Sequence, residues 1–186
     1  MADKTRMTAL RLDLDTMRKK FRVRKAGACI AIDLDGSTLR AVQTAPRGEG
    51  VFVSRIIAES LDLPADTDRN DPVVIGRAIA ATLGRAGIKT GPVIMGIPRP
   101  MVVLRTLLLP AVEQERELAS MVHFQIAKDL PFRFEEAVID FTLRRRLPGS
   151  GEEPEKVEVL VAAVKREVVE FYQRAAAEGT RDRADH

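Results

Sequence analysis

The stretch Ala28-Cys-Ile-Ala-Ile-Asp-Leu-Asp-Gly-Ser-Thr-Leu-Arg-Ala-Val-Gln-Thr44 decides the fold of this chain. Apolar residues over 28–34 and again over 39–44 predict two strands, because both segments are rich in residues that suit a pleated sheet. The run Asp35-Gly36-Ser37 lies between them and is typical of a tight hairpin turn. A third strand is expected over 51–58, so this part of the chain predicts a meander of three antiparallel strands.

Helix signals follow the meander. Asp71 is suited to an N-cap and Pro72 to the first helical turn, and apolar residues then recur at helical spacing as far as Gly87. A further apolar strand is expected over 93–97. This first unit, residues 28–100, therefore predicts the order β-β-β-α-β.

A second unit begins after the break at Pro98-Arg99-Pro100. Its strands are expected over 101–109, 137–145 and 156–164. The helix between the first two strands has its apolar stripe at Leu118, Met121, Val122 and Ile126. A return helix is expected up to residue 178. The predicted fold class is therefore α/β, with a second unit of order β-α-β-β after residue 100.

Length and charge divide the chain into four segments. Its 186 residues suffice for one domain or two small subdomains. We predict a basic leader over 1–27, the first unit over 28–100 and the inserted unit with its return helix over 101–178. The tail over 179–186 has almost no apolar residues and is expected to be disordered.

Composition excludes several classes of protein. No apolar run approaches the roughly 18 residues that a membrane-spanning helix needs. The single cysteine, Cys29, cannot form an internal disulfide and lies in a strand pattern typical of a core. Two histidines are too few for most imidazole metal sites. We therefore expect no metal site and assign no catalytic residue.

The basic charge is concentrated near the N-terminus. Residues 1–25 hold nine Lys or Arg and three Asp, whereas the rest of the chain holds 21 basic and 24 acidic residues. The body is thus mildly acidic, and with one tyrosine and no tryptophan it offers little for stacking on bases. Nucleic acid is not an expected partner.

The leader carries an apolar stripe at helical spacing. The stripe consists of Met7, Leu10, Leu14, Met17 and Phe21, and the basic residues around it are Arg11, Arg18, Lys19, Lys20 and Arg22. Such a helix is suited to an anionic inner-membrane surface, where each basic residue contributes about 1 kcal/mol. Asp13 and Asp15 oppose that attraction. The alternative is a partly disordered arm or a helix docked on a partner.

Several motifs follow the order of a known family. The segment from Ile30 to Val42 looks like a phosphate loop, with an apolar strand, an Asp, small residues and a basic residue entering the second strand. Val93 to Pro98, then Leu130-Pro131-Phe132, then the run from Glu155 to Val169 continue that order. The chain over 28–178 resembles the type IV pilus assembly protein PilM family, a bacterial branch of the actin-like superfamily that also contains the cell-division protein FtsA. The resemblance implies an actin-like, ribonuclease H-like half, subdomain 1A, with an inserted subdomain 1C.

The resemblance implies a degenerate nucleotide phosphate loop, at Asp33, Asp35, Gly36, Ser37 and Thr38. Gly36 is displaced by one position from the family's pattern, and an acidic Asp35 would repel a polyphosphate unless Mg²⁺ intervened. The alternative is that Asp35-Gly36 is simply a hairpin turn. The resemblance also places the second phosphate loop beyond this sequence. We therefore expect no cofactor and no enzyme activity in this chain alone, with ATP and Mg²⁺ only in a full-length family member.

The resemblance further implies a partner and a location. Family members lie on the cytoplasmic face of the inner membrane and hold the cytoplasmic N-terminal peptide of a PilN-like membrane protein in a groove between subdomains 1A and 1C. Phe132 and Phe134 are expected to anchor this peptide, since Pro131 prevents the preceding helix from continuing over them. The alternative is that both rings face the core.

The leading function is therefore an adaptor of type IV pilus assembly, cytoplasmic and peripheral to the inner membrane. Its rivals are an actin-like nucleotide-binding ATPase and an FtsA-like or type II secretion membrane tether. Two other polar residues are interpreted as structural. His123 lies beside the apolar stripe of its helix, and Arg105 is expected to pair with a carboxylate such as Asp140 on a neighbouring strand.

Overall fold

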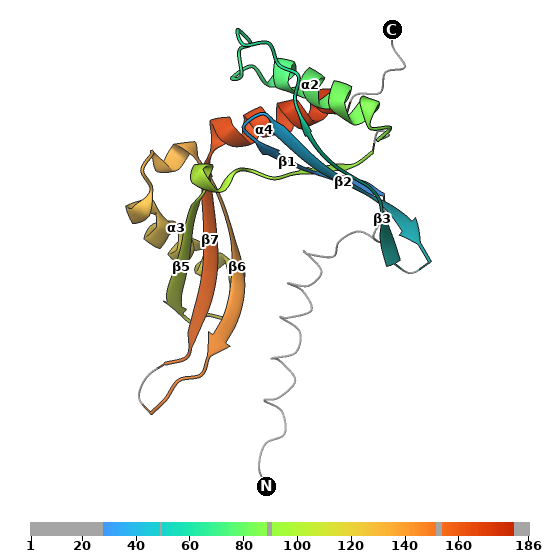
Figure 1. The fold of residues 1–186 in the computed structure, drawn as a ribbon. Coiled ribbons are helices and arrows are strands. Elements are labelled where there is room, and N and C mark those ends of the chain that lie inside the picture. The colour runs from blue at the N-terminus through green and yellow to red at the C-terminus, as the bar shows by residue number, and fades with distance from the viewer. Residues whose placement is uncertain (1–27, 49, 89–90, 152–153, 181–186) are drawn as a thin grey trace.

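The computed structural model describes residues 28–48, 50–88, 91–151 and 154–180. These residues form two sheets, one of four strands and one of three, with helices packed on them (Figure 1). The leader and the chain beyond residue 180 lie outside the described residues, and with them the predicted membrane-contact residues Arg11, Arg18, Lys19, Lys20 and Arg22.

Sheet A has four strands in the order β3-β2-β1-β4. Their bounds are β1 Cys29–Asp35, β2 Thr38–Arg47, β3 Gly50–Ser60 and β4 Val93–Met95. The first three form the predicted antiparallel meander, and β4 runs parallel to β1. Along β1, Ile30, Ile32 and Leu34 are buried while the residues between them are not. This alternation is typical of a sheet that is covered on one face.

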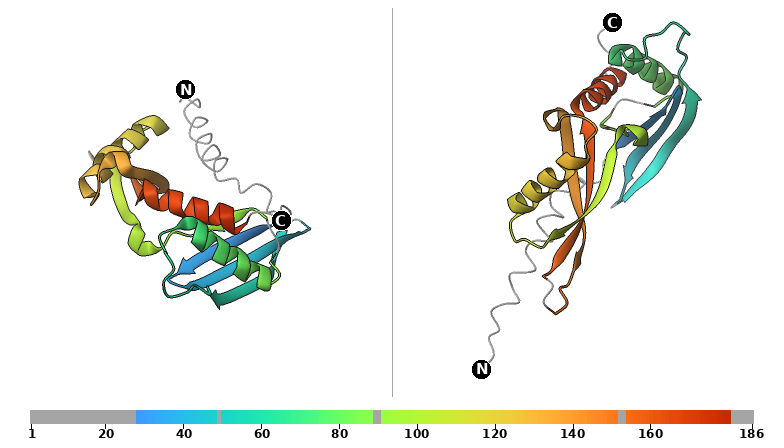
Figure 2. Two further views of the ribbon diagram at one scale, coloured as in Figure 1. Left: turned by 90° about the horizontal axis from the view of Figure 1, so that it is seen from above. Right: turned by 90° about the vertical axis from the view of Figure 1, so that its left-hand side faces the viewer.

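Helix α2 (Pro72–Arg85) has the ends that its sequence indicates. The Asp71 carboxylate accepts a hydrogen bond of 2.8 Å from the Val73 N–H, and Gly87 adopts a φ of +67° just beyond the C-cap. The apolar stripe of α2 packs on the inner face of sheet A. Helix α4 (Arg166–Gly179) lies beside α2 on that same face (Figures 1 and 2).

Sheet B is separate and has the strand order β5-β7-β6. Its elements are β5 Val103–Pro110, α3 Glu115–Ile126, β6 Ala137–Leu147 and β7 Lys156–Lys165. Short 3₁₀ turns lie between them at η2 Arg99–Met101, η3 Ala127–Asp129 and η4 Phe134–Glu136. Leu118, Val122 and Ile126 of α3 pack on Val159 and Val161 of β7, which gives sheet B its own core. The predicted β-α-β-β insertion is therefore confirmed.

Two expectations need correction. Gly179, which we assigned to the disordered tail, is buried and is the last residue of α4. Arg105 pairs through its Nε with Asp129 at 3.3 Å, and not with Asp140. Strand β7 lies between the strands of Arg105 and Asp140, and the register places Asp140 on the opposite face of sheet B.

Candidate functional site

A cleft of about 630 Å³ lies where the chain crosses between the two sheets. Its lining comes from the β1–β2 turn, the start of α2, the segment after β4 and the first turns of α4. The lining residues are Leu34, Asp35, Gly36, Arg69, Asn70, Ile75, Pro98, Met101, Glu167, Val168, Phe171 and Tyr172. Because this volume lies within the range of about 300–1,000 Å³ that is usual for ligand sites, we treat the cleft as the candidate site.

The backbone of sheet A positions the cleft at the carboxyl ends of its two parallel strands. The Gly96 N–H donates a hydrogen bond of 2.8 Å to the Ile32 carbonyl, which keeps the chain beside β1 after β4 has ended. Pro98 and η2 then lead away to sheet B, and α4 returns from it. Crevices at the carboxyl ends of parallel strands are common binding sites in α/β proteins. Here the walls are the two segments that connect the sheets, namely the outgoing segment of Pro98 and η2 and the first turns of the returning helix α4.

The floor of the cleft is apolar. Leu34, Ile75 and Tyr172 are buried, and the rings of Phe171 and Tyr172 meet edge to face at 5.4 Å between centroids. The Tyr172 hydroxyl lies 3.9 Å from the Met101 sulfur, so it links α4 to η2, where the chain leaves sheet A. Burial raises the pKa of the Tyr172 hydroxyl, and the negative charge of Asp33 adds to the effect. Such a floor is suited to apolar side chains of a ligand.

The charged residues of the lining are Asp35, Arg69 and Glu167, so carboxylates outnumber cations. The Lys165 ammonium lies 3.3 Å from the Glu167 carboxylate, but the Glu167 side chain remains largely exposed. The lining therefore presents apolar surface below and two largely exposed carboxylates at the rim. Asp35 pairs with Arg40 and Glu167 with Lys165, but both carboxylates remain open to solvent and can also accept hydrogen bonds from a basic ligand.

The predicted phosphate loop is a two-residue hairpin turn at Gly36 and Ser37, with Asp35 and Thr38 paired at its base. Gly36 has a φ of +61°, which a type II′ turn requires at its first position. The Ser37 carbonyl accepts a hydrogen bond of 2.7 Å from the Leu61 N–H. Of the five predicted loop residues, only Asp35 and Gly36 line the cleft.

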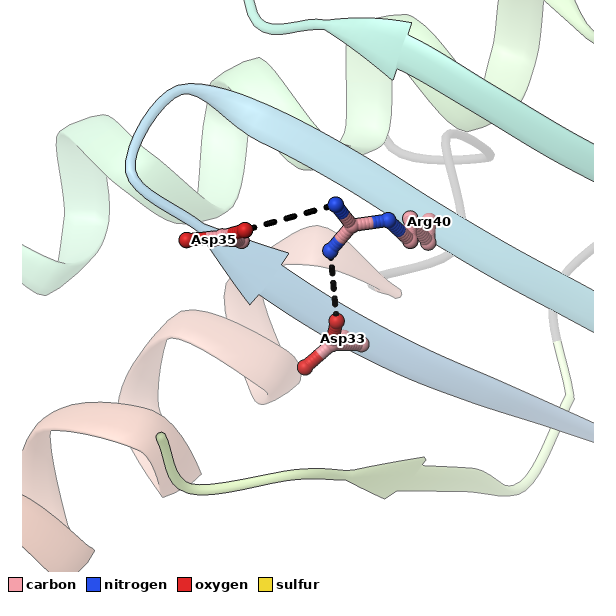
Figure 3. A network of polar contacts seen from close by, with 3 residues as sticks. All are labelled: Asp33, Asp35 and Arg40. Atoms are coloured by element: carbon pink, nitrogen blue, oxygen red, sulfur yellow. Dashed lines mark hydrogen bonds and ion pairs between the residues drawn. The ribbon is translucent and has the colours of Figure 1, made fainter. Parts of the chain in front are cut away.

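Arg40 is held by both acids of this turn (Figure 3). Its guanidinium bonds the Asp33 carboxylate at 3.0 Å and the Asp35 carboxylate at 3.3 Å, and these bonds raise the pKa of Arg40. The turn therefore offers a phosphate two carboxylates and a cation that both carboxylates already engage. Among the described residues there is also no group of three or more His, Cys, Asp or Glu side chains that could hold a metal ion. These side chains do not fit a polyphosphate.

Phe132 and Phe134, the predicted peptide anchors, are not part of the cleft lining. Phe132 is half-buried, whereas Phe134 is 40% exposed and meets His123 edge to face at 5.8 Å. The residues after Phe134 line a second cavity of about 330 Å³, formed by Glu135, Glu136, Lys165, Arg166, Glu167 and Glu170. Glu167 lines both cavities, so the two meet at the first turn of α4.

The comparisons place this arrangement in a known class. A meander sheet with both helices on one face, and a second sheet inserted after β4, is one half of an actin-like protein. Residues 31–180 match the family model of the type IV pilus assembly protein PilM, and the chain belongs to this family.

The solved structure of a "PilM-PilN type IV pilus biogenesis complex" has a similar fold, with a TM-score of 0.67 and 21% sequence identity. The match covers 82% of this chain and 44% of that one, so the chain spans less than half the length of the solved relative. No helix of the described residues is long and apolar enough to span a bilayer.

Sequence reasoning missed most of the cleft. Arg69 precedes α2 in a loop with no distinctive pattern, and Glu167 belongs to an ordinary first helical turn. One available signal was the position of Pro98 after a strand that is parallel to β1, because such strand ends usually border a site. That signal depends on knowing that β4 pairs with β1.

Proposed function

We propose that this chain acts in type IV pilus assembly as an adaptor whose cleft binds the short cytoplasmic segment of a PilN-like inner-membrane protein. The family match supports the role in pilus assembly, and the similar solved structure is a complex of PilM with PilN. The observation that carries the proposal is the cleft between the two chain crossings, with its apolar floor and acidic rim. The family match over 31–180 also favours pilus assembly over cell division or type II secretion.

The chemistry of such a segment fits this lining. Short cytoplasmic segments next to a membrane-spanning helix carry an excess of Lys and Arg. The rim carboxylates Asp35 and Glu167 are placed to attract those cations, while Leu34, Ile75 and Phe171 accept apolar side chains. A peptide that combines both features gains affinity from the floor and orientation from the rim.

The second cavity extends the proposed groove. Its six lining residues include four acidic side chains, among them Glu167, which is shared with the cleft. An extended peptide that leaves the cleft over Glu167 would run along the first turn of α4 toward Phe134. In this arrangement Phe134 contacts the end of the peptide, and the predicted anchor role moves mainly to the cleft floor.

The location follows from the same proposal. A partner segment that emerges from the inner membrane holds the adaptor on the cytoplasmic face. The basic leader adds an attraction to anionic lipid. We propose that the chain is cytoplasmic and peripheral to the inner membrane.

The rival function is ATP hydrolysis by an actin-like site. Asp33 and Asp35 oppose it, because these two carboxylates beside the turn together bind Arg40, the nearby cation that a phosphate would need. We propose that the chain is not an enzyme.

Calorimetric titration with the cytoplasmic N-terminal peptide of the cognate PilN-like protein tests the adaptor role. Binding is expected for the wild type, with a loss of affinity of up to about fivefold in Glu167→Gln, because exposed charge pairs contribute about 0.2–1 kcal/mol. Glu117→Gln, on the exposed surface of α3, is the matched control and should bind normally. No binding by the folded wild type would reject the proposal.

The same titration tests the aromatic residues. If either ring is an anchor, Phe132→Ala or Phe134→Ala loses about 2 kcal/mol of binding free energy or more. Circular dichroism establishes that each variant is folded. Unchanged affinity in both variants would assign the anchor to the cleft floor alone.

A further inference from the structure

The outer face of sheet A, opposite α2 and α4, carries a continuous apolar patch. Ile94, Ala31, Val42 and Ile56 are neighbours in one row across all four strands. Val53 and Val51 pair with Thr44 and Pro46, so they extend the same face along β3 beyond its bulge. We call these six residues the outer patch.

The outer patch is uncovered among the described residues. Ile56 is 71% exposed and Ile94 is 64% exposed, whereas on the inner face of the same sheet Ile30, Ile32 and Leu39 are buried under the helices. The ribbon shows both helices on the inner side (Figures 1 and 2). The charged residues Asp33, Asp35 and Arg40 of the outer face lie at the other end of β1, by the turn (Figure 3). Contiguous exposed apolar surface of this kind marks a contact surface.

The leader joins the sheet at the apolar end of this face. Strand β1 begins at Cys29, whose neighbours across the sheet are Thr44 and Val53. Seven residues, 22–28, separate the last residue of the leader stripe, Phe21, from Cys29. Fully extended, they reach about 23–25 Å, whereas four strands are only about 14 Å across. The stripe can therefore reach every strand of the patch.

The stripe also matches the patch in size and chemistry. From Met7 to Phe21 a helix is about 21 Å long, enough to cross the four strands. In a helix its five apolar residues would form one stripe that needs an apolar surface to cover it, while its basic residues would remain in solvent. A tethered segment meets the patch at an effective concentration in the millimolar range. This favours the leader over a second copy of the chain as the occupant.

We propose that the leader stripe docks on the outer patch when no membrane is present. The same apolar residues cannot contact both the patch and a lipid surface, so docking and membrane binding exclude each other. The leader is then a switch whose two positions are the outer face of sheet A and the anionic membrane. The docking involves only the leader and sheet A, and it does not depend on peptide binding in the cleft.

Paramagnetic relaxation measured on the full chain tests the docking. A spin label is attached at Thr16→Cys, which a helix places away from the stripe, in a Cys29→Ser background. The methyl signals of Ile56 and Ile94 are expected to broaden, while those of Ile126 in α3 and Ile139 in β6 stay sharp. Sharp signals at Ile56 and Ile94 would overturn the proposal. The control is a mixture of spin-labelled chains without isotope enrichment and isotope-enriched chains without a spin label. Equal broadening in this mixture would also overturn the proposal, because the leader of a second copy would then occupy the patch.

A matched pair of surface variants gives the second test. Ile56→Asp removes an exposed residue of the outer patch, and Phe124→Asp makes the same charge change at a 70% exposed residue of α3. Only Ile56→Asp should abolish the broadening of the Ile94 methyl signal, which both variants retain. It should also bind vesicles of phosphatidylglycerol and phosphatidylcholine about threefold more tightly than Phe124→Asp, if about two thirds of the leaders are docked. Equal broadening in the two variants would contradict docking at the patch.

Discussion

The contact between α2 and α4 depends on Gly76, and an added methyl group there should measurably destabilise the protein. A Cβ built on Gly76 would lie 2.6 Å from the Glu178 Cβ and 2.8 Å from the Ala175 carbonyl oxygen. The second atom belongs to the backbone of α4 and cannot rotate away. In Gly76→Ala the two helices must therefore separate, and overpacking of this kind costs about 1–3 kcal/mol.

The matched control is Gly84→Ala, at an exposed position of the same helix. Alanine favours the helix over glycine by up to about 1 kcal/mol, and this gain applies to both variants. The difference between the two free energies of unfolding therefore isolates the clash, and we expect Gly76→Ala to be less stable by about 1–3 kcal/mol. Urea unfolding followed by circular dichroism measures it. Equal stability of the two variants would refute the close helix contact on which the position of α4, and hence one wall of the cleft, depends.

Three further predictions concern the cleft, the turn and the leader. Tyr172 is the only tyrosine, so tyrosinate absorbance reports its pKa directly, and this pKa should lie above the ordinary 10.0. In Asp33→Asn the pKa of Tyr172 should be lower than in the wild type, because the negative charge of Asp33 is removed. Because the unfolded chain loses this proton first, stability should fall as pH rises past about 10, and Tyr172→Phe should remove that fall; an ordinary pKa would contradict burial. ATP hydrolysis should stay at background, and micromolar ATP binding that Asp33→Ala abolishes would contradict the proposal. Binding to anionic vesicles should weaken with salt and vanish on deletion of residues 1–25, whereas equal binding after deletion would exclude a membrane role for the leader.

Local signals in the sequence predicted the elements of the fold well. Asp71 and Gly87 set the ends of α2 because a cap and a left-handed turn each require particular residue types. The break at Pro98-Arg99-Pro100 separated the two units because two prolines so close together interrupt a strand. The turn at Gly36 was also predicted from a residue type, because glycine readily adopts the positive φ that a tight hairpin needs. The observed φ of +61° agrees with the hairpin alternative.

Long-range geometry explains what the sequence did not reveal. The partner of Arg105 depends on which strand lies beside β5 and on which face each side chain points, and neither follows from spacing along the chain. The cleft likewise combines residues from the β1–β2 turn through α4, so no single motif contains it. The apolar spacing of the last helix indicated its buried side, yet the tail boundary was misplaced at Gly179. Glycine often follows the end of a helix, and only the packing against Ile79 shows that Gly179 is a buried residue of α4.

The adaptor role is tested most directly by methyl NMR of the full chain during titration with the cytoplasmic N-terminal peptide of the cognate PilN-like protein. The predicted result is that signals of Ile75, Met101 and Val168, which line the cleft, shift in proportion to the bound fraction. Signals of Val122 and Ile126 in the core of sheet B should stay in place. Shifts confined to sheet B, or no shifts at peptide concentrations that saturate the calorimetric signal, would contradict binding in the cleft.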